Sequence, residues 1–123
     1  MRDGKPVYER GFTLVDLGQI IGRQHRTETT LLSRSTPARQ VKADLIGALS
    51  RKGTYVIANF DRRALAQEGR GHFAPLGAYH ARSDSFLVMD VNRKRGWTWI
   101  DADSLINAMR GHDRGYLKVS SAP

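Results

Sequence analysis

The stretch GHFAPLGAYH, residues 71–80, decides how the second half of this chain is read. It has the apolar and aromatic residues of a β-strand, but His72 and Pro75 interrupt it. A second strand-like stretch follows at residues 84–91, and its apolar run VMDV, residues 88–91, contains a lone aspartate, Asp90. The polar residues between the two runs are typical of a turn. The sequence therefore predicts an antiparallel hairpin over residues 71–91.

The two polar residues of this hairpin, His72 and Asp90, are predicted to face each other. In an antiparallel pair, residues directly opposite each other are equally far from the turn and share a face of the sheet. The midpoint between His72 and Asp90 is Ala81, which lies inside the polar tip. Their spacing is even, so both side chains point the same way. We expect an imidazole–carboxylate hydrogen bond.

Such a bond has two interpretations that the spacing leaves open. A carboxylate can fix the tautomer of a histidine and stabilise its imidazolium, as in a nucleophile–His–acid triad. A histidine beside an acid can equally be a satisfied polar pair without a catalytic role. His80 is interpreted as a turn residue. We expect no metal site at His72 and His80, because the sequence positions no third ligand.

The composition limits the class of protein. The chain has 123 residues, of which 40% are hydrophobic, enough for one compact domain over residues 1–123. It has no cysteine, so it contains neither a disulfide nor a thiol nucleophile. No apolar run is long enough to span a membrane, and the first residues lack the apolar region of a signal peptide. We expect a cytoplasmic protein without a membrane partner.

The charge is strongly positive. Twenty Lys and Arg against twelve Asp and Glu give a formal net charge of +8. Such a surface attracts anions, either small acidic substrates or nucleic acid. The basic residues are scattered, however, and no RNP-like motif, helix-turn-helix signature or Cys/His finger accompanies them. We therefore expect an arginine-rich soluble surface rather than a nucleic-acid partner, and keep a basic binding module as an alternative class.

Helical patterns mark two segments in the first half of the chain. The apolar spacing after Thr13 predicts a helix with Thr13 as its N-cap, and Asp16 is placed to complete a capping box. A second and clearer helix is predicted further on. Thr36 is expected to cap it, Pro37 to occupy its first position and Gly53 to close it.

Strand patterns dominate the rest of the chain. The predicted strands are residues 27–33, 54–60, 71–79, 84–91, 96–100 and 115–120, with a polar loop at 61–71 and a helix at 101–110. The order is helix, strand, helix, then mostly antiparallel strands with one late helix. This order predicts an α+β fold.

The sequence from residue 58 to residue 110, ANFDRRALAQEGRGHFAPLGAYHARSDSFLVMDVNRKRGWTWIDADSLINAMR, followed by RGYLKV, closely resembles the C-terminal lobe of the phytochelatin synthases. These are papain-like glutathione γ-glutamylcysteinyltransferases, and the resemblance extends over nearly the whole chain. It implies a papain-like cysteine-protease fold of α+β class. This chain would be the antiparallel β-sheet lobe with its flanking helices. The N-terminal, cysteine-bearing lobe would be missing.

The resemblance also implies roles for individual residues. His72 matches the base of the family's triad, and Asp90 matches its orienting acid. The residues that match the family's substrate-binding positions are Arg62, Gln67, Arg93 and Arg114. Arg114 is a candidate partner for the glutamyl carboxylate of the substrate. Arginines suit a peptide that carries two carboxylates.

The chain departs from the family pattern at several positions. The nucleophilic cysteine of the family would precede Met1. The residues before Arg62 are NFD instead of a tyrosine-histidine pair, and Ala74 replaces a serine. The loop before Arg114 is short, so an acidic contact of the family is expected to be missing or moved to Asp113. These changes bear on substrate geometry rather than on the fold.

The implied activity is acyl transfer from glutathione. A thiolate attacks the Cys–Gly amide, glycine leaves, and the γ-glutamylcysteinyl group passes to another glutathione or to water. Family activity depends on cadmium or zinc as metal–glutathione thiolates, so we expect no cofactor or metal held by protein ligands. Without a cysteine the chain is expected to be inactive alone. In the first alternative it is part of an enzyme, and its partner is a cysteine-bearing N-terminal lobe or a second copy in a homodimer. In the second alternative it is a non-catalytic pseudoenzyme or docking lobe.

Overall fold

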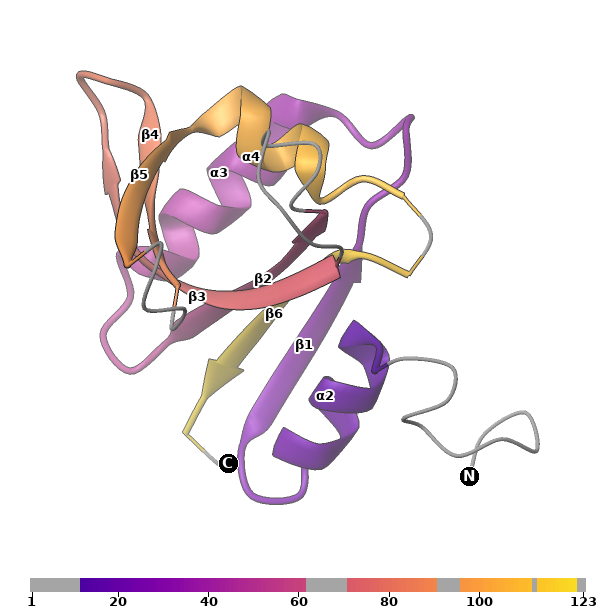
Figure 1. The fold of residues 1–123 in the computed structure, drawn as a ribbon. Coiled ribbons are helices and arrows are strands. Elements are labelled where there is room, and N and C mark those ends of the chain that lie inside the picture. The colour runs from indigo at the N-terminus through magenta and orange to yellow at the C-terminus, as the bar shows by residue number, and fades with distance from the viewer. Residues whose placement is uncertain (1–11, 62–70, 91–95, 112, 122–123) are drawn as a thin grey trace.

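The computed structural model describes residues 12–61, 71–90, 96–111 and 113–121, which form three helices and one six-stranded sheet (Figure 1). The helices are α2 (Leu14–Ile21), α3 (Ala38–Leu49) and α4 (Ala102–Ala108). The strands are β1 (Arg26–Leu31), β2 (Tyr55–Asp61), β3 (Gly71–His80), β4 (Ser85–Met89), β5 (Trp97–Asp101) and β6 (Gly115–Ser120). The α+β class predicted from the element order is confirmed.

The sheet joins the two ends of the chain. Its strand order is β1-β6-β2-β3-β4-β5, and every neighbouring pair is antiparallel. The last strand, β6, therefore lies between the first two. Residues far apart in sequence thus meet in the centre of the sheet, whereas β2 to β5 follow one another in chain order.

Helices cover the two faces of the sheet unequally. A Cβ added to Gly18 of α2 would lie 3.3 Å from the side chain of Leu117 on β6. Helix α2 therefore packs on the face of the sheet to which Leu117 points. The neighbouring residue Tyr116 belongs to the buried cluster that includes Val41 and Leu45 of α3. Adjacent strand residues point to opposite faces. Hence α2 lies on one face, and α3 lies with α4 on the other.

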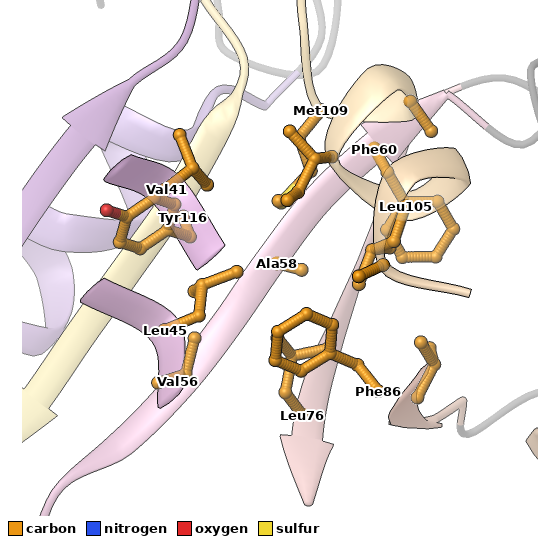
Figure 2. Packing of buried hydrophobic residues seen from close by; sticks show 14 of the residues in the cluster. Val41, Leu45, Val56, Ala58, Phe60, Leu76, Phe86, Leu105, Met109 and Tyr116 are labelled. Carbon is orange, nitrogen blue, oxygen red and sulfur yellow. The ribbon is translucent and has the colours of Figure 1, made fainter. Parts of the chain in front are cut away.

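The main core lies between β2, β3 and β4 and the two helices α3 and α4 (Figure 2). Each of its side chains is almost fully buried, and each buried Val, Leu, Ile, Phe or Met contributes about 1.5–3 kcal/mol of burial free energy. The residues labelled in Figure 2 are Val41, Leu45, Val56, Ala58, Phe60, Leu76, Phe86, Leu105, Met109 and Tyr116. None of the described helices has the length and apolar character needed to cross a membrane.

The predicted cap of the first helix is confirmed. The backbone N–H of Asp16 donates to Thr13 Oγ1 over 3.1 Å, and the backbone N–H of Thr13 donates to Asp16 Oδ2 over 2.9 Å. These two bonds satisfy donors at the start of α2 that have no partner within the helix. The late helix also has a local cap, because Asp101 Oδ2 accepts the backbone N–H of Ser104 over 3.0 Å.

The predicted ends of α3 are wrong. Pro37 occupies the N-cap position, and no side chain caps this helix. Thr36 Oγ1 instead accepts the backbone N–H of Ser33 over 2.9 Å, so its hydroxyl is used in the preceding turn. At the other end the helix stops at Leu49, before Gly53. Gly53 has a φ of +82° and belongs to the turn that leads into β2.

Candidate functional site

The structure brings His72 and Asp90 into contact. The distance from His72 Nε2 to Asp90 Oδ1 is 3.0 Å, so the predicted hydrogen bond is confirmed. The carboxylate side chain is only 5% exposed, whereas the imidazole is 22% exposed. An ionised carboxylate can only accept, so Nε2 carries the proton of this bond. Nδ1 is then the ring nitrogen left to exchange a proton with another group.

The predicted register of the hairpin is wrong. The backbone N–H of Asp84 donates to the Ala81 carbonyl over 3.2 Å, and the strand pairing begins at His80 and Ser85. The turn is therefore centred one to two residues beyond Ala81. Ala78 pairs with Leu87 in the same register. If this register continued along β3, His72 and Asp90 would lie on opposite faces, because a one-residue slip reverses the direction of every side chain.

A β-bulge at Gly77 corrects the direction of the side chains. The register shifts between the pairs Ala78–Leu87 and Leu76–Val88, which leaves Gly77 as the extra residue on β3. From there on, even-numbered residues of both strands share a face. Continuing this register places Asp90 diagonally across from His72, within reach of a histidine side chain. The bulge thus accounts for the contact that direct pairing was predicted to give.

The position of the bulge suits glycine. A Cβ added to Gly77 would lie 2.8 Å from Met89 Sδ and 3.2 Å from Leu87 Cδ2. The side chain of Met89 therefore crosses closely over the bulge. A glycine inside a strand is a known sign of a bulge or close approach, so the sequence contained a signal for this residue that our prediction did not use.

Phe60 of β2 packs against the imidazole. It pairs directly with His72 in the register between β2 and β3. The two ring centroids are 5.7 Å apart and the planes are inclined by 79°, an edge-to-face contact. Phe60 is 1% exposed and so has little freedom to move. The imidazole is thus held by Asp90 through a hydrogen bond and by Phe60 through packing, and the sequence prediction did not single out Phe60.

Arg114 lies at the same end of the sheet as His72. It directly precedes Gly115, which pairs with Asn59, while the next residue of β2, Phe60, pairs with His72. A Cβ added to Gly111 would lie 2.8 Å from a guanidinium nitrogen of Arg114. The other substrate-binding residues predicted by resemblance, Arg62, Gln67 and Arg93, lie outside the described residues.

The second histidine of the hairpin lies at the turn. Ser83 donates its backbone N–H to His80 Nδ1 over 3.2 Å, and the Ser83 hydroxyl lies 2.8 Å from the same nitrogen. The ring also makes an edge-to-face contact with Trp99. Within the described ranges, no group of three or more His, Cys, Asp or Glu side chains is arranged to hold a metal ion.

Comparison with known proteins gives a consistent match. A family model described as phytochelatin synthase matches residues 2–118. The chain is 36% identical over 83 residues to glutathione gamma-glutamylcysteinyltransferase 3 of Lotus japonicus. It is 35% identical over 98 residues to glutathione gamma-glutamylcysteinyltransferase 1 of Triticum aestivum. A glutathione gamma-glutamylcysteinyltransferase of Schizosaccharomyces pombe is 28% identical over 85 residues.

These relatives are much longer than the matched segments. The first two matches cover 62% and 72% of this chain but only 17% and 20% of the relatives. The yeast match covers 63% of this chain and 20% of the relative. The chain therefore spans about a fifth of the length of the curated relatives that it matches.

Proposed function

Because the chain belongs to the phytochelatin synthase family, we propose that it carries the base and the orienting acid of a glutathione γ-glutamylcysteinyltransferase. In this proposal it is the sheet-bearing lobe of a papain-like domain. The nucleophilic cysteine comes from a separate N-terminal lobe, since residues 1–123 contain none. The 3.0 Å contact between His72 Nε2 and Asp90 Oδ1 is the observation that supports this role best.

The proposed reaction uses the two ring nitrogens of His72 differently. Asp90 accepts from Nε2 and keeps the tautomer in which Nδ1 is free to accept a proton. Nδ1 takes the proton of the cysteine thiol, and the thiolate attacks the Cys–Gly carbonyl of glutathione. When the C–N bond breaks, the leaving glycine amine receives that proton. The thioester is then attacked by an amine of a second glutathione or by water, which gives its proton to Nδ1. The C–S bond breaks, and the leaving thiolate takes that proton back to restore the thiol.

Substrate recognition is proposed to rest on the arginines. Arg114, with Arg62, Gln67 and Arg93, would bind the carboxylates of a γ-glutamyl peptide by charge-assisted hydrogen bonds. Arg114 already lies at the end of the sheet that carries His72. Cadmium or zinc would enter as a metal–glutathione thiolate, that is, as part of the substrate.

A complementation assay tests this proposal. The chain is mixed with a cysteine-bearing N-terminal lobe of a relative, and glycine release from glutathione is measured with cadmium or zinc present. We expect turnover only in the mixture, and a loss of about a hundredfold or more in the His72→Ala variant, because a general base is removed. His80→Ala is the matched control, since it removes the other histidine of the same hairpin, and it should retain activity.

Two results would contradict the proposal. Turnover by the isolated chain that His72→Ala abolishes would mean that no cysteine-bearing partner is needed. A mixture that forms a stable complex without releasing glycine would favour the second candidate, a non-catalytic pseudoenzyme or docking lobe. The lack of any cysteine in residues 1–123 is the observation that keeps this candidate open.

A further inference from the structure

A polar pocket that is lined by neither His72 nor Asp90 lies at one end of the molecule. The connection from β1 to α3 and the connection from α4 to β6 run close together at one end of the molecule (Figure 1), where Leu32 forms an isolated bridge with Arg110. A pocket of about 520 Å³ opens there, lined by Arg34, Asn107, Arg110 and Gly111. This volume lies within the usual range for small-ligand sites. Two lining residues carry a guanidinium group, and none carries a carboxylate.

Arg110 is held in place by the neighbouring connection. One guanidinium nitrogen donates to the Ser33 carbonyl over 2.6 Å and to the Thr36 carbonyl over 2.7 Å. These acceptors are neutral, so they orient the guanidinium without neutralising its charge. The group is thus in position before any ligand binds, which lowers the entropic cost of binding.

No acidic side chain is among the residues that line the pocket. The ion pairs of Lys42 with Asp84, of His72 with Asp90 and of Lys118 with two acids, all within the described residues, do not include Arg34 or Arg110. The final carbonyls of α4, at residues 105–107, accept the backbone N–H groups of residues 109 and 110. These carbonyl oxygens therefore already accept hydrogen bonds from the backbone of the same chain.

A third guanidinium lies close to the pocket. Gly111 lines the pocket and has a φ of +132°, and a Cβ added to it would lie 2.8 Å from a guanidinium nitrogen of Arg114. The position of Gly111 therefore leaves room for the Arg114 side chain. Three arginines around one glycine raise the local positive potential, which attracts small anions.

From this arrangement we propose that the pocket lined by Arg34 and Arg110 binds a small oxyanion, either a carboxylate or a phosphate group. The two guanidinium groups supply charge and paired donors, and the Asn107 amide supplies a further donor. The proposal needs no cysteine, metal or acyl transfer. It shares only the neighbouring Arg114 with the proposed substrate site, and its test rests on Arg34 and Arg110 rather than on His72 and Asp90.

Titration of the whole chain with inorganic phosphate and, separately, with succinate tests the site. Calorimetry at low salt and at 150 mM NaCl gives the affinity, and amide NMR shifts of Asn107 and Gly111 give the location. We expect saturable binding by one of the two probes, and the stronger probe identifies the preferred oxyanion. Arg34→Ala should weaken binding about tenfold or more, because a charged hydrogen bond is lost.

The control variant separates a site from general charge attraction. Arg23→Ala removes one exposed arginine next to α2, at the opposite end of β1, and should leave the affinity unchanged. Because Arg110 also holds the connection at Ser33 and Thr36, Arg110→Lys is used instead of alanine, and it should also weaken binding by losing the planar fork. Equal affinities of wild type and Arg34→Ala, or equal losses in Arg34→Ala and Arg23→Ala, would overturn the proposal.

Discussion

At the scale of single residues, His72 is constrained from two directions. Asp90 binds Nε2, and Phe60 packs against the ring at a centroid distance of 5.7 Å. The hydrogen bond determines which nitrogen carries the proton, while the packing limits rotation of the ring. An imidazole held in this way offers one defined nitrogen to a reaction partner, which general base catalysis requires.

Replacing Asp90 by Asn should leave the fold intact but release the tautomer of His72. An amide presents both a donor and an acceptor, so Nε2 no longer has to carry the proton. Nitrogen-15 NMR of the imidazole should show a single neutral tautomer in the wild type and a mixture in Asp90→Asn. His80, whose Nδ1 accepts from Ser83, is an internal reference and should not change. An unchanged His72 spectrum in Asp90→Asn would show that Asp90 does not orient the ring.

At the scale of elements, the bulge in β3 joins two parts of the hairpin whose strand registers differ by one residue. Near the turn, Tyr79 and Phe86 pair and face the core, and further along Leu76 and Val88 do so. The core-facing residues of β3 thus change from odd to even numbers at Gly77, whereas those of β4 stay even. Because β3 contains this extra residue, apolar side chains face the core on both sides of Gly77.

Replacing Gly77 by Val should destabilise the chain by about 1–3 kcal/mol, the usual cost of overpacking. The added Cβ would lie 2.8 Å from Met89 Sδ. Urea unfolding measures the loss of stability. Gly77→Val should cost less in a Met89→Ala background than in the wild type, because the side chain that it would contact is then shorter. Gly47→Ala is the control, since nothing lies within 4 Å of a Cβ there and a helix favours alanine. Equal effects of Gly77→Val with and without Met89 would argue against a close contact.

At the scale of the whole molecule, a polar network joins β1, β6 and α3. Lys118 of β6 lies 3.2 Å from Glu28 of β1 and 2.9 Å from Asp44 of α3, and the Tyr116 hydroxyl donates to the same aspartate. Burial alone would raise the pKa of Asp44, but hydrogen bonds from Tyr116 and Lys118 hold it below the ordinary value. The network attaches α3 to β6, the last strand of the chain, and through Lys118 to β1, the first strand.

The chain should therefore lose stability in acid. A carboxyl group whose pKa is lower in the folded state stabilises the fold above its unfolded pKa, about 3.9, and this contribution disappears as the pH falls through the folded pKa. Urea unfolding between pH 7 and pH 2.5 should show this decline. Asp44→Asn should lower stability at pH 7 by about 0.5–1.5 kcal/mol and reduce the decline. Asp103 is an exposed acid of α4, so Asp103→Asn is the control. It should leave the stability at pH 7 and the decline in acid nearly unchanged. A steeper acid decline in Asp44→Asn would contradict this account.

Local chemistry in the sequence was enough to predict most elements and part of the site. The capping box of Thr13 and Asp16 spans three residues and forms as predicted. The hairpin also follows from a turn and two apolar runs, whereas the contact of His72 with Asp90, although predicted, depends on a bulge that the prediction did not include. The cap expected from Thr36 was wrong, because the nearby Ser33 backbone uses the same hydroxyl. Two local partners compete there, and spacing does not decide between them.

What the sequence by itself determined about this protein is therefore what depends on neighbours within a few residues: the capping box of α2, the hairpin and the α+β order of its elements. Only the tertiary structure decided the bulge at Gly77, the packing of Phe60 on His72 and the place of β6 between β1 and β2. Strand register and order are set by core packing between segments far apart in the chain. Those contacts form only when the whole sheet is assembled, so no short stretch of sequence contains them.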